Sequence, residues 1–295
     1  MSNLFSRGLK SLFGADLPGC ACEFTQGEVR AVRASADRKT VVSHASAPLA
    51  DGVIRPGVKD PNITDVEAVS SALGRVLGEV GFSGSELVGV IPDDSVRIGL
   101  LEVDSFPSAA ADQRSFIQWK LKKHVQFNVN DAAVAWQKIG ENGVVDLLTV
   151  LAPRSVTSQY EEIVDGLGLH AGSLTASTLA ALNLMDTAVL GTDVLFVKLT
   201  ASSVVTTILS NQKLRFYRKV PRAGALEDAV HPTLMYYQDR LSGDSGSGLG
   251  QMVLCSDLDA DAGSAIAARL GLPSRPLGGT ATPDAFKPAL GALQS

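Results

Sequence analysis

The clearest pattern of apolar and polar positions lies at 193–224. Three stretches rich in β-branched and aromatic residues begin at Val194, Val204 and Leu214, and short polar turns separate them. Such side chains fit the pleated, half-buried surface of a sheet, and each stretch has the length of a strand. The pattern therefore predicts a contiguous three-stranded meander.

A shorter version of this pattern lies near the N-terminus. Residues 20–25 read as a strand, 26–28 as a turn and 29–34 as the returning strand, in which Arg30 and Arg33 alternate with apolar residues. We expect this hairpin and the later meander to be equivalent units, each in a sheet of mixed direction that helices flank.

Helix and strand patterns alternate between these two units. Residues 63–81 place apolar side chains at three-to-four spacing, with Thr64 or Asp65 as the N-cap and Gly81 as the stop. A buried strand at 87–92 follows directly. A helix followed by a strand, each bounded by turn residues, predicts an α/β crossover.

The first residues have a helical pattern of their own. The apolar residues of 4–13 fall on one half of a helix, with Arg7 and Lys10 opposite. A terminal helix that packs on its own domain, or frays, is the simpler interpretation. Docking to a partner or peripheral contact with a membrane stays open, although two cations attract a membrane weakly.

Composition and charge narrow the function classes. The chain has 295 residues, 45% of them hydrophobic, which is enough for a large core or two medium domains. A net charge of -5 argues against a nucleic-acid partner. Three scattered cysteines predict neither a disulfide framework nor a metal site, and they fit a reducing cytoplasm. No apolar run reaches the ~18 residues of a spanning helix, so we expect a soluble chain.

Several blocks between the two units carry a family resemblance by their order. The blocks are Ile91–Arg97, the strand Ile98–Val103 with Phe106-Pro107, the helix Ala110–Val125, the tail Asn128–Gln137, the strand Leu147–Arg154, and Gly166–Met185. Together with the meander they resemble the PilM family, the cytoplasmic actin-like proteins of type IV pilus assembly. That family is related in design to FtsA and to the cytoplasmic part of GspL. The resemblance covers most of residues 15–272.

The resemblance implies an α/β fold of the actin-like ATPase type, with two ribonuclease-H-like halves and a small α+β inserted subdomain. The second half is expected to be reduced, because 225–241 reads as one helix before the linker 243–250, where the family inserts a further subdomain. The expected organisation is an amphipathic segment 1–14, a first half 15–190 with the insert at about 95–152, a second half 191–277 and a tail 278–295.

The bends that bind phosphate in actin-like ATPases differ here. Those proteins place Asp-x-Gly at the first bend of each half, where the Asp holds a metal-bound water and the Gly lets backbone approach phosphate. The later half has Lys198 and Thr200 at these places, and the first half has Glu23, Thr25 and Arg30. Lys198 reads as a solvated or salt-bridged lysine, or as a point charge for phosphate.

A third nucleotide motif is also absent. The family's Gly-Gly near the adenine is replaced by a strand that runs into Ser256 and Asp257. Because all three motifs differ, we expect a degenerate nucleotide cleft with no catalytic residue, no metal and no cofactor. The alternative keeps ATP and Mg in an unorthodox pocket of Glu23, Arg30 and Lys198.

A binding surface is the better functional candidate. The helix at 112–125 has one stripe expected to face the core: Ile117, Leu121 and His124. Phe116, Trp119 and Lys123 form a second face, either an interface anchor or one side of a helix sandwiched inside the domain. By resemblance, PilM-type proteins hold a short cytosolic peptide of the membrane protein PilN between the first subdomain and the insert. We therefore place partner binding in 97–137, on these three residues.

The expected function is a non-catalytic scaffold of a type IV pilus or related secretion machine, cytoplasmic and peripheral at the inner face of the inner membrane. Its partner would be a membrane-anchored assembly protein, bound through a short cytosolic tail. Two alternatives stay open: a genuine ATP-binding PilM-type protein, and a self-associating, FtsA-like filament protein. The four histidines are isolated from one another and are expected as surface or capping residues.

Overall fold

The computed structural model describes residues 18–38, 40–59, 61–141, 143–185, 192–210, 213–242, 248–257, 261–278 and 281–294. The chain divides into two compact units, one of residues 1–183 with 288–295 and one of residues 184–287. The predicted boundary between the halves was 190/191, and 278–295 was predicted as a separate tail. The amphipathic segment 1–14 lies outside the described residues.

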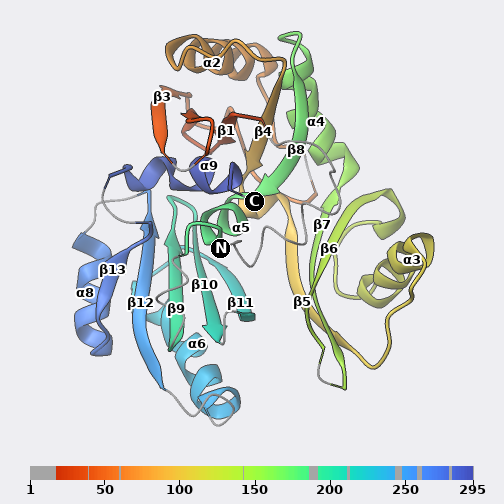
Figure 1. Ribbon diagram of the computed structural model, residues 1–295, viewed down its shortest axis with the longest axis vertical. Coiled ribbons are helices and arrows are strands. Elements are labelled where there is room, and N and C mark those ends of the chain that lie inside the picture. Colours follow the sequence, from red (N-terminus) through yellow and green to blue (C-terminus); the bar gives the residue numbers. More distant parts are fainter. Residues whose placement is uncertain are drawn as a thin grey trace. The chain divides into compact units, whose positions relative to one another are not determined.

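A five-stranded sheet forms the core of the first unit (Figure 1). Its strands are β1 (Cys20–Phe24), β2 (Glu28–Ala34), β3 (Val41–Pro48), β4 (Glu86–Ile91) and β8 (His170–Ala176). The order is β3-β2-β1-β4-β8, in which β1, β2 and β3 are antiparallel and β1, β4 and β8 are parallel. The predicted hairpin at 20–34 and the strand after it are confirmed.

Three helices belong to this sheet. They are α2 (Val66–Glu79), α4 (Arg154–Asp165) and α5 (Ser177–Leu182). Helix α2 begins where predicted, because the Asp65 carboxylate accepts a hydrogen bond from the Ala68 backbone N–H at 2.9 Å. Its apolar stripe, which includes Val69, Leu73 and Val76, is fully buried in the core of the unit.

The second unit repeats the first sheet. Its strands are β9 (Asp193–Leu199), β10 (Ser203–Ser210), β11 (Lys213–Pro221), β12 (Leu249–Ser256) and β13 (Ser274–Pro276), with helices α6 (Leu226–Arg240) and α8 (Asp261–Leu270). The order β11-β10-β9-β12-β13 and the strand directions match those of the first sheet position by position. The predicted meander, and the predicted equivalence of the two halves, are confirmed.

The insert of the first unit is a three-stranded antiparallel sheet with one helix. It consists of β5 (Arg97–Val103), α3 (Ala110–Leu121), β6 (Ala132–Glu141) and β7 (Val145–Pro153), in the sheet order β5-β7-β6. A single helical turn at Asp93–Ser95 precedes it, and another at Val129–Asp131 lies between α3 and β6. The prediction that α3 reaches residue 125 with His124 in the core is wrong: the helix ends at Leu121 and His124 is exposed.

The chain ends with a helical turn at Asp284–Phe286 and the helix α9 (Lys287–Ala292). Residues 288–295 belong to the first unit, where the Asn183 side-chain amide donates a hydrogen bond to the Gly291 carbonyl at 3.1 Å. Across the described ranges, no helix combines the length and the apolar character needed to cross a membrane.

Candidate docking groove and hairpin bends

The bend between β1 and β2 is closed by a threonine. The Thr25 backbone N–H donates to the Glu28 carbonyl at 3.0 Å, and the Thr25 hydroxyl donates to the same carbonyl at 2.8 Å. In return, the Glu28 N–H donates to the Thr25 Oγ1 at 3.0 Å. In a phosphate-binding bend, a backbone amide at this place would face the phosphate. Here the amide is already hydrogen-bonded within the turn.

The bend between β9 and β10 repeats this arrangement. The Thr200 N–H donates to the Ser203 carbonyl at 3.0 Å, the Thr200 hydroxyl to the same carbonyl at 3.2 Å, and the Ser203 N–H to the Thr200 Oγ1 at 3.0 Å. The two threonines that replace glycine therefore have the same structural role in both halves. The sequence already contains a signal for these closed bends: Thr25 follows Glu23 by two residues, and Thr200 follows Lys198 by two residues.

The first bend also has a buried ion pair. Glu23 and Arg30 are cross-strand partners and are 2% and 4% exposed. The Arg30 Nη1 lies 3.3 Å from the Glu23 Oε2, and the Arg30 Nε lies 2.7 Å from the Glu28 Oε1. The Ser177 hydroxyl donates to the other Glu23 oxygen. The carboxylate at the place of the metal-holding acid is therefore held by a cation and a hydroxyl.

The second half has a cation at the equivalent place. Lys198 lies in the central strand β9 between Val205 and Cys255 and is 2% exposed, so its interpretation as a solvated lysine is wrong. Ser256 is buried at the end of β12, and the next residue, Asp257, donates its N–H to the Leu199 carbonyl at 3.0 Å.

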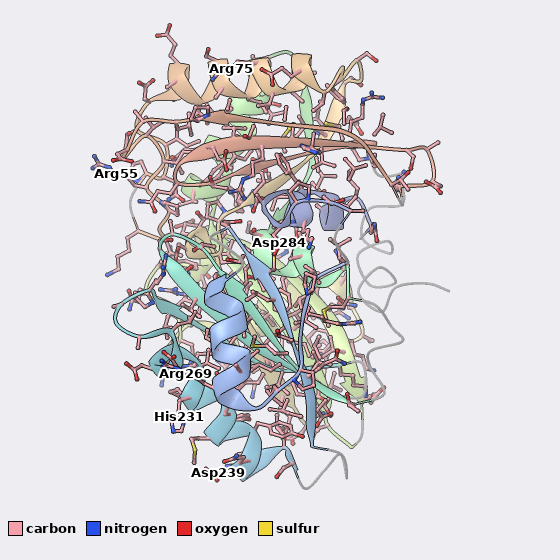
Figure 2. The ribbon with its side chains drawn as sticks, turned by 90° about the vertical axis from the view of Figure 1, so that its left-hand side faces the viewer. Arg55, Arg75, His231, Asp239, Arg269 and Asp284 are labelled. Atoms are coloured by element: carbon pink, nitrogen blue, oxygen red, sulfur yellow. The ribbon has the colours of Figure 1, made fainter. Side chains whose placement is uncertain are left out.

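These residues do not fit Mg-ATP as an actin-like ATPase holds it. A lysine ammonium cannot ligate a divalent metal, and a threonine Cβ stands where backbone would approach phosphate. Among the residues that the structure describes, no three His, Cys, Asp or Glu side chains gather as metal ligands. All four histidines are exposed, including His124, which the helical spacing had placed in the core; Figure 2 shows His231 on α6.

The first unit contains an apolar groove of about 330 Å³. One wall is a face of the insert sheet, formed by Leu148, Val150 and Ala152 of β7. Helix α4 contributes Arg154, Thr157 and Glu161, which bring one charge of each sign to the groove. The volume and the apolar lining with few polar groups are typical of a binding site.

Two strand edges open into the same groove. Residues 133–137 of β6 and residues 171–176 of β8 line it consecutively, so both faces and the backbone of each strand border it. Within the described part of the chain, β6 pairs with β7 alone and β8 with β4 alone. Edge strands present unpaired N–H and C=O groups, which are a template for another extended segment.

The predicted docking residues lie on the other side of the insert sheet. Helix α3 lies beside the insert strands (Figure 1). It packs through Ile117 on Leu151, whose side chain alternates with those of the groove residues along β7. Trp119 is 68% exposed, Phe116 is half-buried and Lys123 is exposed. The structure thus makes Trp119 a surface residue, and it does not bring these three side chains into the groove. Of segment 97–137, it is β6 that borders the groove.

Comparison with known proteins gives matches of structure and none of sequence. No family model matches the chain, and no curated protein matches it. A structure described as the PilM-PilN type IV pilus biogenesis complex matches with a TM-score of 0.78 and 14% identity, over 95% of this chain and 98% of that one. The cytoplasmic domain of EpsL, an inner membrane component of the type II secretion system of Vibrio cholerae, matches with a TM-score of 0.55 and 11% identity, over 94% of each chain.

A Bacteroides thetaiotaomicron protein with an actin-like ATPase fold and unknown function also matches, with a TM-score of 0.53 and 9% identity, over 92% of this chain and 94% of that one. At such identities the likeness shows the fold. The chain has the actin-like ATPase fold, as the order of its sequence blocks predicted.

Proposed function

We propose that the chain is a non-catalytic actin-like scaffold of a type IV pilus or related secretion machine. In this role it binds the cytosolic tail of an inner-membrane assembly protein, at the cytoplasmic face of the inner membrane. The similarity to the PilM-PilN complex over 95% of the chain and to the cytoplasmic domain of EpsL supports this proposal. By their descriptions, the first is a type IV pilus biogenesis complex and the second belongs to an inner membrane component of a type II secretion system.

The observation that carries the proposal is the groove with two open strand edges. An extended tail can add to a strand edge, so that main-chain hydrogen bonds supply affinity and side-chain pockets supply specificity. Six consecutive residues of β8 border the groove, which corresponds to ~20 Å of extended chain. Leu148, Val150 and Ala152 would receive the apolar side chains of the tail, and Arg154 and Glu161 its polar ones.

The proposal that the scaffold is non-catalytic rests on the bends. Thr25 and Thr200 engage amides within their own turns, Arg30 engages Glu23, and Lys198 replaces an acid. Metal-assisted hydrolysis needs a bound divalent cation and a positioned water, and these bends supply no free carboxylate array for either. Among the described residues, no contact at these bends favours the alternative of an ATP-binding PilM-type protein in the same way.

Groove binding is tested with synthetic peptides that copy the N-terminal cytosolic tails of inner-membrane proteins of the same cell. Val150→Glu puts a charge on the half-buried apolar wall and should weaken the binding of the tail at least tenfold, or about 1.4 kcal/mol. Val42→Glu is the matched control, because Val42 is 52% exposed on β3, away from the groove. Equal loss in both variants would contradict the proposal.

Nucleotide chemistry is tested separately. We expect calorimetry with Mg-ATP to give no binding in the micromolar range and a phosphate-release assay to give no turnover. Micromolar binding together with turnover that Glu23→Ala abolishes would replace the scaffold by the ATPase alternative. Concentration-dependent polymerisation in light scattering would favour the filament-forming alternative instead.

A further inference from the structure

The exposed surface of α3 and of the turn that follows it carries a patch that the groove does not use. We call it the basic-aromatic patch and define it as Arg114, Trp119, Lys120, Lys122 and Lys123, all of which are exposed. Trp119, at 68% exposure, is the most exposed of the large apolar side chains in the described ranges. An exposed indole leaves a large apolar surface in water. The side chains around Trp119 therefore indicate which kind of partner could cover it.

The aromatic part of the patch is held in place from below. Phe116 packs edge-on against Phe106, with ring centres 5.8 Å apart, and its ring centre lies 6.1 Å from that of Trp119. The Lys120 ammonium lies 5.7 Å from the Phe116 ring centre and 5.3 Å from that of Trp119. An indole is thus presented at the surface with a cation beside it.

The charge of the patch opposes that of the whole chain. The patch has four cations, whereas the chain carries a net charge of -5. The acid on the same helix, Asp112, lies two residues before Arg114 but ten residues before Lys122, which is about 15 Å along the axis from Lys122 and beyond the screening length at physiological salt. Cations near a helix C-terminus complement the helix dipole, but the dipole does not account for the exposed indole.

We propose that the basic-aromatic patch binds the surface of a bilayer that contains anionic phospholipid. Indole rings favour the headgroup level, where their apolar body is buried and their N–H stays solvated. Lysines next to such a ring are attracted by anionic headgroups, by roughly fivefold in partitioning for each cation. Because α3 covers the sheet face opposite the groove, lipid on the patch leaves the groove open. This inference does not depend on the proposed function.

The test uses the full chain and sedimented vesicles. We expect binding to vesicles of phosphatidylcholine with about one third phosphatidylglycerol, weakening as salt rises, and no binding to pure phosphatidylcholine. Replacing Lys120, Lys122 and Lys123 by Gln should lower the binding on the order of a hundredfold. Replacing Arg55, Lys59 and Arg75 by Gln removes the same charge elsewhere on the unit and should leave the binding unchanged; Figure 2 shows Arg55 and Arg75 at the surface.

Fluorescence reports on the patch directly. The chain has two tryptophans, so Trp136→Phe leaves Trp119 as the single reporter. Its emission should shift to the blue when phosphatidylglycerol vesicles are added and stay unchanged with inorganic phosphate alone.

Three results would overturn the proposal. The first is binding that survives the triple lysine substitution, which would place lipid contact elsewhere. The second is an equal loss in the arginine and lysine control, which would show a nonspecific charge effect. The third is an absence of vesicle binding, or a response of Trp119 to free phosphate or to a tail peptide instead of to vesicles.

Discussion

The two faces of the sheet β5-β7-β6 differ in what covers them. On one face, α3 packs through Ile117 and Leu151, which are 0% and 1% exposed. On the other, Val150 and Ala152 line an apolar groove beside the edges of β6 and β8. A small sheet with an apolar face must bury that face against another element. The face under α3 therefore explains the stability of the insert, and the groove face, on which Val150 is only half-buried, explains what the insert can bind.

The largest effect expected from this comparison is on the covered face. Leu151→Ala should lower the free energy of unfolding by about 2–5 kcal/mol, because it leaves a cavity under α3. Thermal unfolding measures this loss. Val150→Ala, on the next residue and the opposite face, should cost less than half as much. Equal costs would show that the two faces are packed alike and would break the comparison.

A variant whose groove is filled by a larger side chain should bind the tail more weakly and keep its free energy of unfolding. Ala135 is exposed on β6 and borders the groove, so Ala135→Trp occupies space that a tail would need. We expect at least tenfold weaker tail binding and an unfolding free energy within about 0.5 kcal/mol of the parent chain. Anisotropy titration and thermal melts on the same sample measure both. Unchanged affinity would exclude the groove as the tail site.

Only a small effect on stability is expected at Trp119. Because its side chain is 68% exposed, Trp119→Ala should change the unfolding free energy by less than about 1 kcal/mol. The sequence-based hypothesis puts the tail on Phe116, Trp119 and Lys123, and it predicts a tenfold loss of tail binding in this variant. If the tail binds in the groove, this variant should lose no affinity for the tail. One titration of this variant decides between the two surfaces.

The sequence predicted the elements whose patterns are long and apolar. The meander was placed because β9 and β10 are continuous β-branched, apolar runs that are buried throughout, and α2 was placed because its buried positions repeat with the helical period. Strand β3 was missed, because its buried residues are the small Ala45 and Ala47 among polar neighbours, which gives a weak signal.

The site was harder to predict than the fold. Substitutions such as Lys198 and Thr25 could be recognised from their positions, but the hydrogen bonds that close both bends required the structure. The groove was not located on β7 and β8, because an open strand edge depends on which strands lack a neighbour, and a local pattern does not encode this. His124 was wrongly placed in the core because helical spacing alone extended α3 past Leu121.

The central claim is that a cytosolic tail pairs with the strand edges in the groove. Hydrogen exchange of the chain, with and without a tail peptide that binds, tests it most directly. We predict slower exchange of backbone amides at 133–137 and 171–176 on binding, and no change at 110–121. Slower exchange on α3 with none at the two strand edges would contradict the account.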